Sequence, residues 1–173
     1  MGELFDIFKY ILPALIVFLT SFYTLKLFLR KEYKNKVIQL KMNNQKLILP
    51  IRLQAYERIA LLLERIALNN LIIRVHKKGM SARLLQAELL KTIRTEFEHN
   101  LSQQIYISSQ AWGAVKTAKE ETIKAINIAA TKVSDDGTGI DLSRVVFDLI
   151  TKVDKLPTEL AIEILKAEVR QVF

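Results

Sequence analysis

Residues 10–25 read YILPALIVFLTSFYTL, and this stretch decides the fold. Its sixteen residues carry no charge, and the largely apolar span extends over residues 7–29, interrupted only by Lys9 and Lys26. An α-helix rises about 1.5 Å per residue, so roughly 20 apolar residues cross a hydrocarbon core about 30 Å thick. Long lysine side chains near the ends of such a span reach the headgroups. The pattern predicts a single transmembrane helix within residues 1–29.

Two other interpretations fit the N-terminal pattern less well. A cleaved signal peptide needs a basic start and a small-residue cleavage site. Here the chain starts with Glu3 and Asp6, and the span ends in Leu-Phe-Leu-Arg-Lys at residues 27–31. A buried core helix is seldom flanked by a basic cluster such as the one that follows. We therefore predict a retained membrane anchor.

Basic residues begin where the apolar span ends, and they predict the orientation. Residues 26–46 contain seven Lys or Arg and one Glu, a local charge of +6, whereas residues 1–9 carry −1. Positive residues stay on the cytoplasmic side. We expect a single-pass protein of the cell inner membrane, with its N-terminus outside and a basic juxtamembrane stalk over residues 30–49. The basic cluster at the membrane surface comprises Lys26, Arg30, Lys31, Lys34 and Lys36.

The rest of the chain is close to charge balance, which bears on the class of partner. The whole chain carries +8, but residues 47–173 carry only +3. A nucleic-acid-binding domain needs a basic patch on the folded domain itself, whereas juxtamembrane lysines are attracted to anionic lipid. The chain has no cysteine, which excludes disulfides and thiolate metal sites. We expect inner membrane lipid, rather than nucleic acid, as a partner.

Residues 50–173 have the length of one domain and a helical pattern. Apolar residues recur three and four apart, and no run alternates as a strand does. The sequence predicts an all-α protein, in which the N-terminal transmembrane helix is followed by a small cytoplasmic bundle of four to five helices. Leu49-Pro50 predicts a break between stalk and bundle, because the residue before proline avoids the α region.

Cap residues place the helices of the bundle. The first expected helix covers about 51–75, with Ile73 in its apolar stripe, and the second covers about 82–105 after an N-cap at Ser81. A third helix reaches about 133 after an N-cap at Ser108 or Ser109, and a fourth starts at Asp141 or Ser143. The last helix has Pro157 in its first position, and its Leu160 is expected to pack.

The end of the second bundle helix holds the one patch with potential chemistry. Glu96 and His99 are three residues apart and share a helix face. A Glu-x-x-His pair supplies ligands in di-iron bundles, but such a site needs two pairs and two further Glu. The only other histidine is His76, and Ile73 stands where its Glu should be. The di-iron interpretation therefore fails.

A structural polar strip is the better interpretation of this patch. Lys119 lies within an apolar stripe, and a buried ammonium needs a carboxylate partner. We expect Lys119 to meet Glu96 or Glu98, or to pack its stem while its head reaches water. The interaction or structural polar cluster comprises Glu96, Glu98, His99, Asn100, Gln103 and Lys119. We expect no catalytic residue, metal or cofactor, and a histidine- or metal-dependent enzyme around Glu96 and His99 is the least favoured alternative.

Several longer motifs carry a family resemblance. They are the N-terminal anchor, Leu49-Pro-Ile-Arg-Leu-Gln-Ala-Tyr-Glu-Arg58, Ile93-Arg-Thr-Glu-Phe-Glu-His-Asn-Leu-Ser-Gln-Gln-Ile-Tyr106, Ala111-Trp112 and Ala118-Lys-Glu120. Over most of its length the chain resembles a family of short, uncharacterised single-pass membrane-anchored proteins of Bacteroidota with a domain of unknown function. The resemblance implies the same topology and a single domain, and it adds no catalytic residue.

These observations together predict a non-enzymatic role. We expect a membrane-anchored adaptor or assembly subunit that presents its cytoplasmic bundle to a protein partner or to another copy of itself. The alternative is a module that binds anionic lipid or nucleic acid through the basic stalk and the arginines of the first bundle helix, which are Arg52, Arg58, Arg65 and Arg74.

Overall fold

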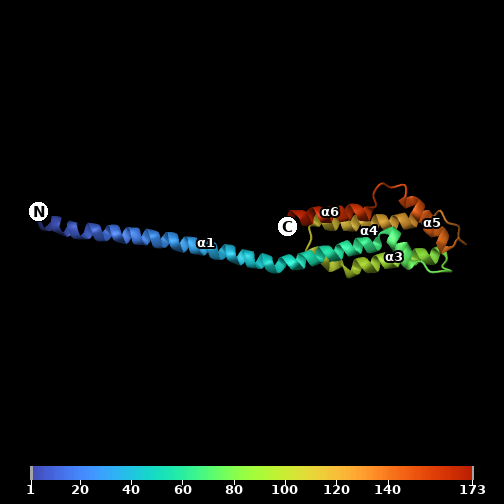
Figure 1. The fold of residues 1–173 in the computed structure, drawn as a ribbon, viewed down its shortest axis with the longest axis horizontal. Helices are drawn as coiled ribbons and strands as arrows, with labels where there is room; N and C mark the ends of the chain where they lie inside the picture. The colour runs from blue at the N-terminus through green and yellow to red at the C-terminus, as the bar shows by residue number, and fades with distance from the viewer. Residues whose placement is uncertain (1, 173) are drawn as a thin grey trace. The chain divides into compact units, whose positions relative to one another are not determined.

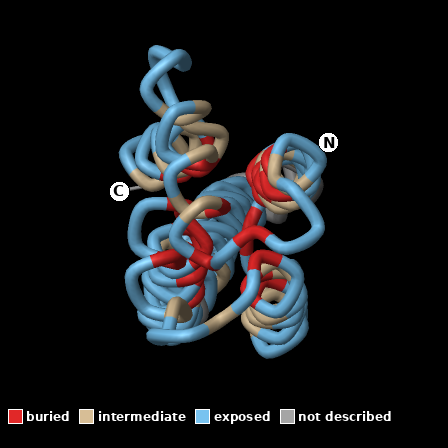
Figure 2. Tube along the Cα trace, turned by 90° about the vertical axis from the view of Figure 1, so that its right-hand side faces the viewer, coloured by how far each residue is buried: buried red, intermediate tan, exposed pale blue. Residues whose placement is uncertain are grey.

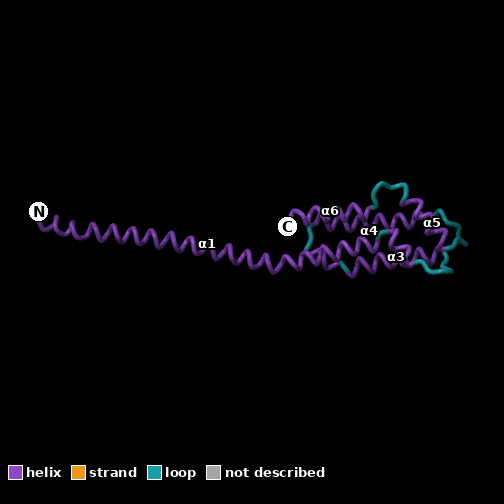
Figure 3. Tube along the Cα trace, viewed as in Figure 1, coloured by secondary structure: helices purple, strands orange, loops and turns teal. Residues whose placement is uncertain are grey.

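The structure is a computed structural model that describes the backbone of residues 2–172 and the side chains of residues 11–43 and 45–171. The described chain is helical (Figure 3), which confirms the all-α prediction. Its elements are α1 (Gly2–Ile66), α2 (Leu68–Val75), α3 (Ala82–His99), the 3₁₀ turn η1 (Leu101–Ile105), α4 (Ser109–Ala130), α5 (Gly139–Ile150) and α6 (Pro157–Val172). The side chains at the start of the predicted span, residues 1–10, lie outside the described residues.

The chain divides into two compact units, residues 1–49 and residues 50–173. In the first unit the described side chains are exposed, except for the half-buried Val37. From Ile11 onward in the described chain, α1 is the one helix that is long and apolar enough to cross a membrane, by length and composition alone. The described side chains of the first unit therefore form no buried core.

The predicted break at Leu49-Pro50 is wrong, because α1 continues through Pro50 (Figure 1). A proline inside a helix removes one hydrogen-bond donor and crowds the carbonyl four residues earlier, at a cost of about 3 kcal/mol. Good helix formers flank it on both sides, including Lys46, Leu47 and Arg52. Their summed preference over a long helix outweighs the single interruption.

The helix predicted over residues 51–75 is two helices. Ala67 has an extended backbone, with ψ of 128°, and separates α1 from α2. Two carbonyls of the last turn of α1 accept side-chain donors from α2, in the pairs Asn70 Nδ2 to Glu64 at 3.2 Å and Arg74 Nη2 to Arg65 at 3.1 Å. The bend also changes which face is buried: Ile73, expected in the apolar stripe, is 76% exposed.

Side-chain caps set two of the expected helix starts. The Ser81 hydroxyl accepts a hydrogen bond from Leu84 N at 3.2 Å, and the Ser108 hydroxyl accepts one from Ala111 N at 3.1 Å. Both N-caps are therefore confirmed, and Ser108 rather than Ser109 caps α4. Pro157 occupies the first position of α6, as expected.

Three other boundaries differ from the prediction. The second bundle helix ends at His99 rather than near residue 105, and α4 ends at Ala130 rather than near residue 133. The fourth helix starts at Gly139, because Thr138 and Asp141 form a capping box in which each side chain bonds to the other residue's backbone N–H. Asp141 is therefore the third residue of the helix, where it completes the capping box, and contrary to the prediction neither it nor Ser143 marks the helix start.

The second unit has one apolar core. α4 packs against α6, α3 and α5, and α3 also packs against α2 and α5. Figure 2 shows the buried segments of these helices turned toward one another. Leu160, expected to pack, is exposed, whereas Leu165 of the same helix is buried, together with Ala161. The largest fully buried side chains are Ile59, Leu62, Leu63, Ile66, Leu71, Leu85, Leu89, Ile93, Val115, Ile126, Leu142 and Val146.

Candidate functional site

Glu96, the acid of the predicted polar cluster, is held by two arginines. Arg65 Nη1 lies 3.2 Å from both carboxylate oxygens of Glu96, and Arg74 Nη1 lies 3.5 Å from Oε1. The Glu96 side chain is only 16% exposed. Since Arg65 and Arg74 lie on either side of the bend at Ala67, the carboxylate ties α3 to both α1 and α2. Its role in the structure is to fix that bend.

The other polar residues at the end of α3 do not form a common site with Glu96. Glu98 and His99 are exposed. Asn100 Nδ2 donates to the backbone oxygen of Glu96 at 2.9 Å, and Gln103 Nε2 donates to the Ser102 hydroxyl at 3.2 Å. Within the described chain, no three His, Cys, Asp or Glu side chains lie close enough to hold a metal ion.

Lys119 does not meet Glu96 or Glu98, so that version of its predicted pairing is wrong. Its Nζ lies 2.8 Å from Glu120 Oε1 and 4.4 Å from the ring centroid of Phe97. An ammonium over an aromatic face is stabilised by the negative potential of the ring. Glu96 is already paired with two arginines, which leaves the ring and the adjacent Glu120 as partners for Lys119. The Lys119 side chain as a whole is 20% exposed.

Behind Lys119, Phe97 stacks on Trp112 with ring centroids 5.2 Å apart. Trp112 is buried, at 8% exposure. Offset-stacked aromatic pairs contribute about 0.5–1.5 kcal/mol beyond their buried area. The three side chains Lys119, Phe97 and Trp112 therefore fix α3 against α4.

A second polar cluster, which sequence reasoning missed, surrounds Glu168 of α6. Glu168 Oε1 accepts hydrogen bonds from the Tyr56 hydroxyl at 2.6 Å and from Ser108 N at 2.9 Å, and Oε2 accepts one from the Ser108 hydroxyl. Arg52 Nη2 donates to the Tyr56 oxygen at 3.1 Å, and Arg52 Nε donates to the backbone oxygen of Tyr106 at 3.1 Å. This Glu168 cluster joins α1, α6 and the N-terminus of α4.

The Glu168 cluster shifts two pKa values in opposite directions. Burial alone would raise the pKa of Glu168, but hydrogen bonds from Ser108 and Tyr56 and the nearby Arg52 charge outweigh it, so that the pKa lies below its usual value. Burial and the hydrogen bond to the Glu168 carboxylate raise the pKa of Tyr56. Both shifts favour an ionised Glu168 and a neutral Tyr56.

No local signal in the sequence identifies the Glu168 cluster. Tyr56 belongs to the apolar stripe of its helix, and Glu168 is one of several charged residues along α6. The residues that meet are 112 positions apart along the chain. Of this cluster, only the N-cap at Ser108 could be predicted from the sequence. An N-cap serine commonly acts through its own hydroxyl alone, so the cap gives no sign that a carboxylate such as Glu168 also binds it.

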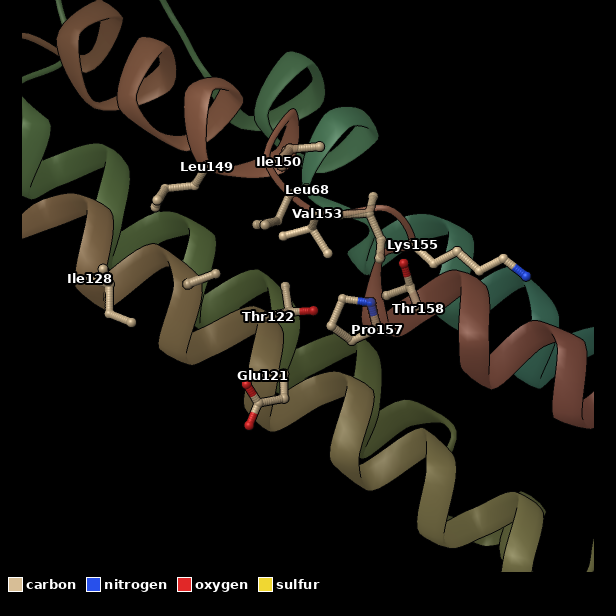
Figure 4. A pocket seen from close by; sticks show the side chains of 12 residues that line it. Leu68, Glu121, Thr122, Ile128, Leu149, Ile150, Val153, Lys155, Pro157 and Thr158 are labelled. Atoms are coloured by element: carbon tan, nitrogen blue, oxygen red, sulfur yellow. The ribbon is translucent and has the colours of Figure 1, made fainter.

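An apolar hollow lies where the 151–156 loop meets α4. It encloses about 300 Å³, and Figure 4 shows Leu68, Val153 and Pro157 entering it from separate elements. At its edge the Lys155 ammonium pairs with Glu163 at 2.8 Å. The lining comprises Leu68, Glu121, Thr122, Ala125, Ile128, Leu149, Ile150, Val153, Lys155, Leu156, Pro157 and Thr158. Such a lining offers apolar shape with few polar groups to orient a substrate.

The predicted basic cluster of the first unit is fully accessible. All five of its side chains are exposed. One of them, Lys36, lies 3.0 Å from Glu32 one helical turn earlier. Exposed pairs of this kind contribute little to stability. One Glu offsets one of the five basic charges, so the cluster as a whole stays positive.

Comparison with known proteins assigns the chain to a family. The sequence matches a family of unknown function, DUF7935, over residues 2–172, and the chain therefore belongs to that family. No curated protein and no solved structure matches it.

Proposed function

We propose that this protein is a single-pass membrane anchor for a cytoplasmic helical bundle, acting as a non-enzymatic adaptor or assembly subunit. One observation carries the proposal: from Ile11 to Leu29 every side chain on α1 is exposed, and most of these side chains are apolar. Leaving so many large apolar side chains in water is costly, since burying each one is worth about 1.5–3 kcal/mol. A bilayer covers all faces of such a helix at once.

The charge pattern supports the orientation. Exposed basic residues follow the apolar segment directly, and basic residues next to a span stay on the cytoplasmic side. The bundle then lies in the cytoplasm, with the N-terminus outside. The resemblance to anchored proteins of Bacteroidota supports placement in an inner membrane.

The organisation of the bundle supports an adaptor rather than an enzyme. Its two conspicuous carboxylates, Glu96 and Glu168, are each held by arginine and by hydrogen bonds that link helices. Groups held in this way stabilise a rigid scaffold, and a rigid scaffold is what presents a binding surface. We therefore assign both clusters a structural role.

Alkaline carbonate extraction of membranes tests the anchor. The intact chain should stay in the membrane pellet, and a variant with Leu15, Val17 and Leu19 replaced by Glu should appear in the soluble fraction. Release of the unaltered chain would contradict the anchor. Crosslinking in membranes followed by mass spectrometry would then identify what the bundle contacts.

The second candidate function is recognition of anionic lipid by the basic cluster. Its support is the exposure of all five basic side chains, each worth about 1 kcal/mol near an anionic surface. A peptide of residues 26–49 should bind vesicles containing phosphatidylserine. Binding should weaken steeply between about 50 and about 200 mM salt, because added salt screens the attraction between exposed charges. A peptide with the five basic residues replaced by Gln is the control, and equal binding by both would exclude this role.

A further inference from the structure

The second unit has a groove between α1 and α6 that its own residues leave open. It holds about 300 Å³ and lies along one side of the bundle. Carbon atoms form nearly all of its surface. Its lining comprises Leu53, Tyr56, Glu57 and Ala60 from α1 and Ile162, Leu165, Lys166, Val169 and Arg170 from α6.

The groove has a fixed floor. The hydrogen bond from the Tyr56 hydroxyl to Glu168 spans the two helices at 2.6 Å, and the Leu165 side chain is buried beneath the surface. Leu53 at the edge of the groove is 40% exposed. The hollow is therefore part of the folded bundle, and its apolar edge lies in water.

The two walls of the groove carry opposite charge. Glu57 lies on the α1 wall, and Lys166 and Arg170 lie on the α6 wall. All three are exposed. Within the described part of the chain, no salt bridge involves any of them. The groove thus presents an acid on one wall and two bases on the other, all without an ionic partner.

We propose that the α1–α6 groove is the interface between two copies of this chain. A twofold axis parallel to the helices places α1 of one copy against α6 of the other. Because Glu57, Lys166 and Arg170 line the same groove, they lie at the same level along the bundle. The rotation therefore brings Glu57 of each copy opposite Lys166 and Arg170 of the second copy, as a self-complementary interface requires.

The geometry also covers the apolar surface. Each groove receives the edge of the other, so that Leu53, Ile162 and Val169 are removed from water at the centre, with the ion pairs at the rim. This is the usual arrangement of an apolar centre and a polar rim. The axis keeps the α1 helices of the two copies parallel. This inference rests on the proposed function, because two chains anchored in one membrane with the same orientation must have parallel α1 helices.

Charge reversal tests the interface in the full chain, reconstituted in detergent and in nanodiscs. Native mass spectrometry should find a dimer of the unaltered chain. Glu57→Lys, or Lys166→Glu with Arg170→Glu, should raise the dimer dissociation constant about tenfold, because two symmetric pairs become repulsive. Mixing these two variants should restore a dimer between them, since both halves of the interface then pair opposite charges.

Two controls separate the interface from loss of folding. Glu121→Lys makes the same charge change on α4, outside the groove, and should leave the dimer unchanged. The chain has no cysteine, so a copy with Glu57→Cys and a copy with Lys166→Cys should form a mixed disulfide on oxidation, at a yield well above that of either copy alone. A misfolded variant would not give this selective crosslink.

Three outcomes would overturn the inference. They are a monomeric full chain in nanodiscs, a dimer insensitive to both charge reversals, and a mixture of the two variants that stays monomeric. A monomer that resists carbonate extraction would reject the dimer and keep the anchor. A dimer that carbonate releases would reject the anchor and keep the interface.

Discussion

At the scale of single residues, Glu168 joins α6 to α1 and to the N-terminus of α4. Its carboxylate accepts bonds from Tyr56 and Ser108, with Arg52 beside it. Glu168→Ala leaves these donors without an acceptor, and unsatisfied buried groups cost about 1–3 kcal/mol. We expect that loss in the free energy of unfolding, measured with urea by fluorescence of the single tryptophan, Trp112.

Glu163 on the same helix provides the matched control for that substitution. Its partner Lys155 is a surface group, and both side chains are more than half exposed. Glu163→Ala should change the free energy of unfolding by less than about 1 kcal/mol. Equal losses for the two variants would mean that the Glu168 cluster contributes no more than a surface pair.

The same cluster predicts a pH dependence with two limits. The folded pKa of Glu168 lies below 4.5, so its contribution is present above pH 4.5 and is lost as pH falls through the folded pKa. The folded pKa of Tyr56 lies above 10.0, so its contribution is present below pH 10.0 and is lost as pH rises through the folded pKa. Urea unfolding measured across this pH range tests both limits. Glu168→Gln should reduce the loss of unfolding free energy at acid pH, and Tyr56→Phe should reduce the loss at alkaline pH.

At the scale of elements, two glycines should respond to alanine in opposite ways. A Cβ at Gly139 would lie 3.0 Å from His76 Cδ2 and 3.1 Å from the Met80 oxygen, where the α5 start meets the loop before α3. A Cβ at Gly113, inside α4, meets nothing within 4 Å. Gly139→Ala should lower the free energy of unfolding by about 1–3 kcal/mol, because the added methyl is overpacked. Gly113→Ala should raise the free energy of unfolding by about 0.5–1 kcal/mol, because alanine favours the helix interior over glycine. Calorimetry of both variants measures the difference, and two shifts of the same sign would contradict the contact.

The elements also show what the sequence can predict. Helical periodicity predicted the helical character of the bundle segments, because a 3.6-residue apolar repeat depends on local positions alone, but it merged α2 with the end of α1. Ser81, Ser108 and Pro157 were predicted as helix starts, because caps are likewise local. The bend at Ala67 was missed: alanine favours helix, and the bend depends on Arg65 and Arg74 meeting Glu96 on another helix. The Glu168 cluster was missed for the same reason, since its members meet only in the tertiary fold.

At the scale of the whole molecule, the proposed membrane topology rests on the asymmetry of charge along the chain. Residues 1–9 carry −1 and residues 26–46 carry +6. The orientation depends on this difference because basic residues resist translocation, whereas acidic residues contribute little. The basic cluster, rather than the fold of the bundle, is therefore expected to keep residues 50–173 in the cytoplasm.

Because the chain lacks cysteine, one introduced thiol reports the orientation. Asp136→Cys lies in an exposed loop between α4 and α5, and Glu3→Cys lies before the span. In intact cells with a permeabilised outer envelope, a membrane-impermeant maleimide should label Glu3→Cys and should reach Asp136→Cys only after lysis. Replacing Lys26, Arg30, Lys31, Lys34 and Lys36 by Gln removes the charge that opposes translocation, so a fraction of Asp136→Cys should then be labelled without lysis. Labelling of the unaltered Asp136→Cys chain in intact cells would place the bundle outside and reverse the topology.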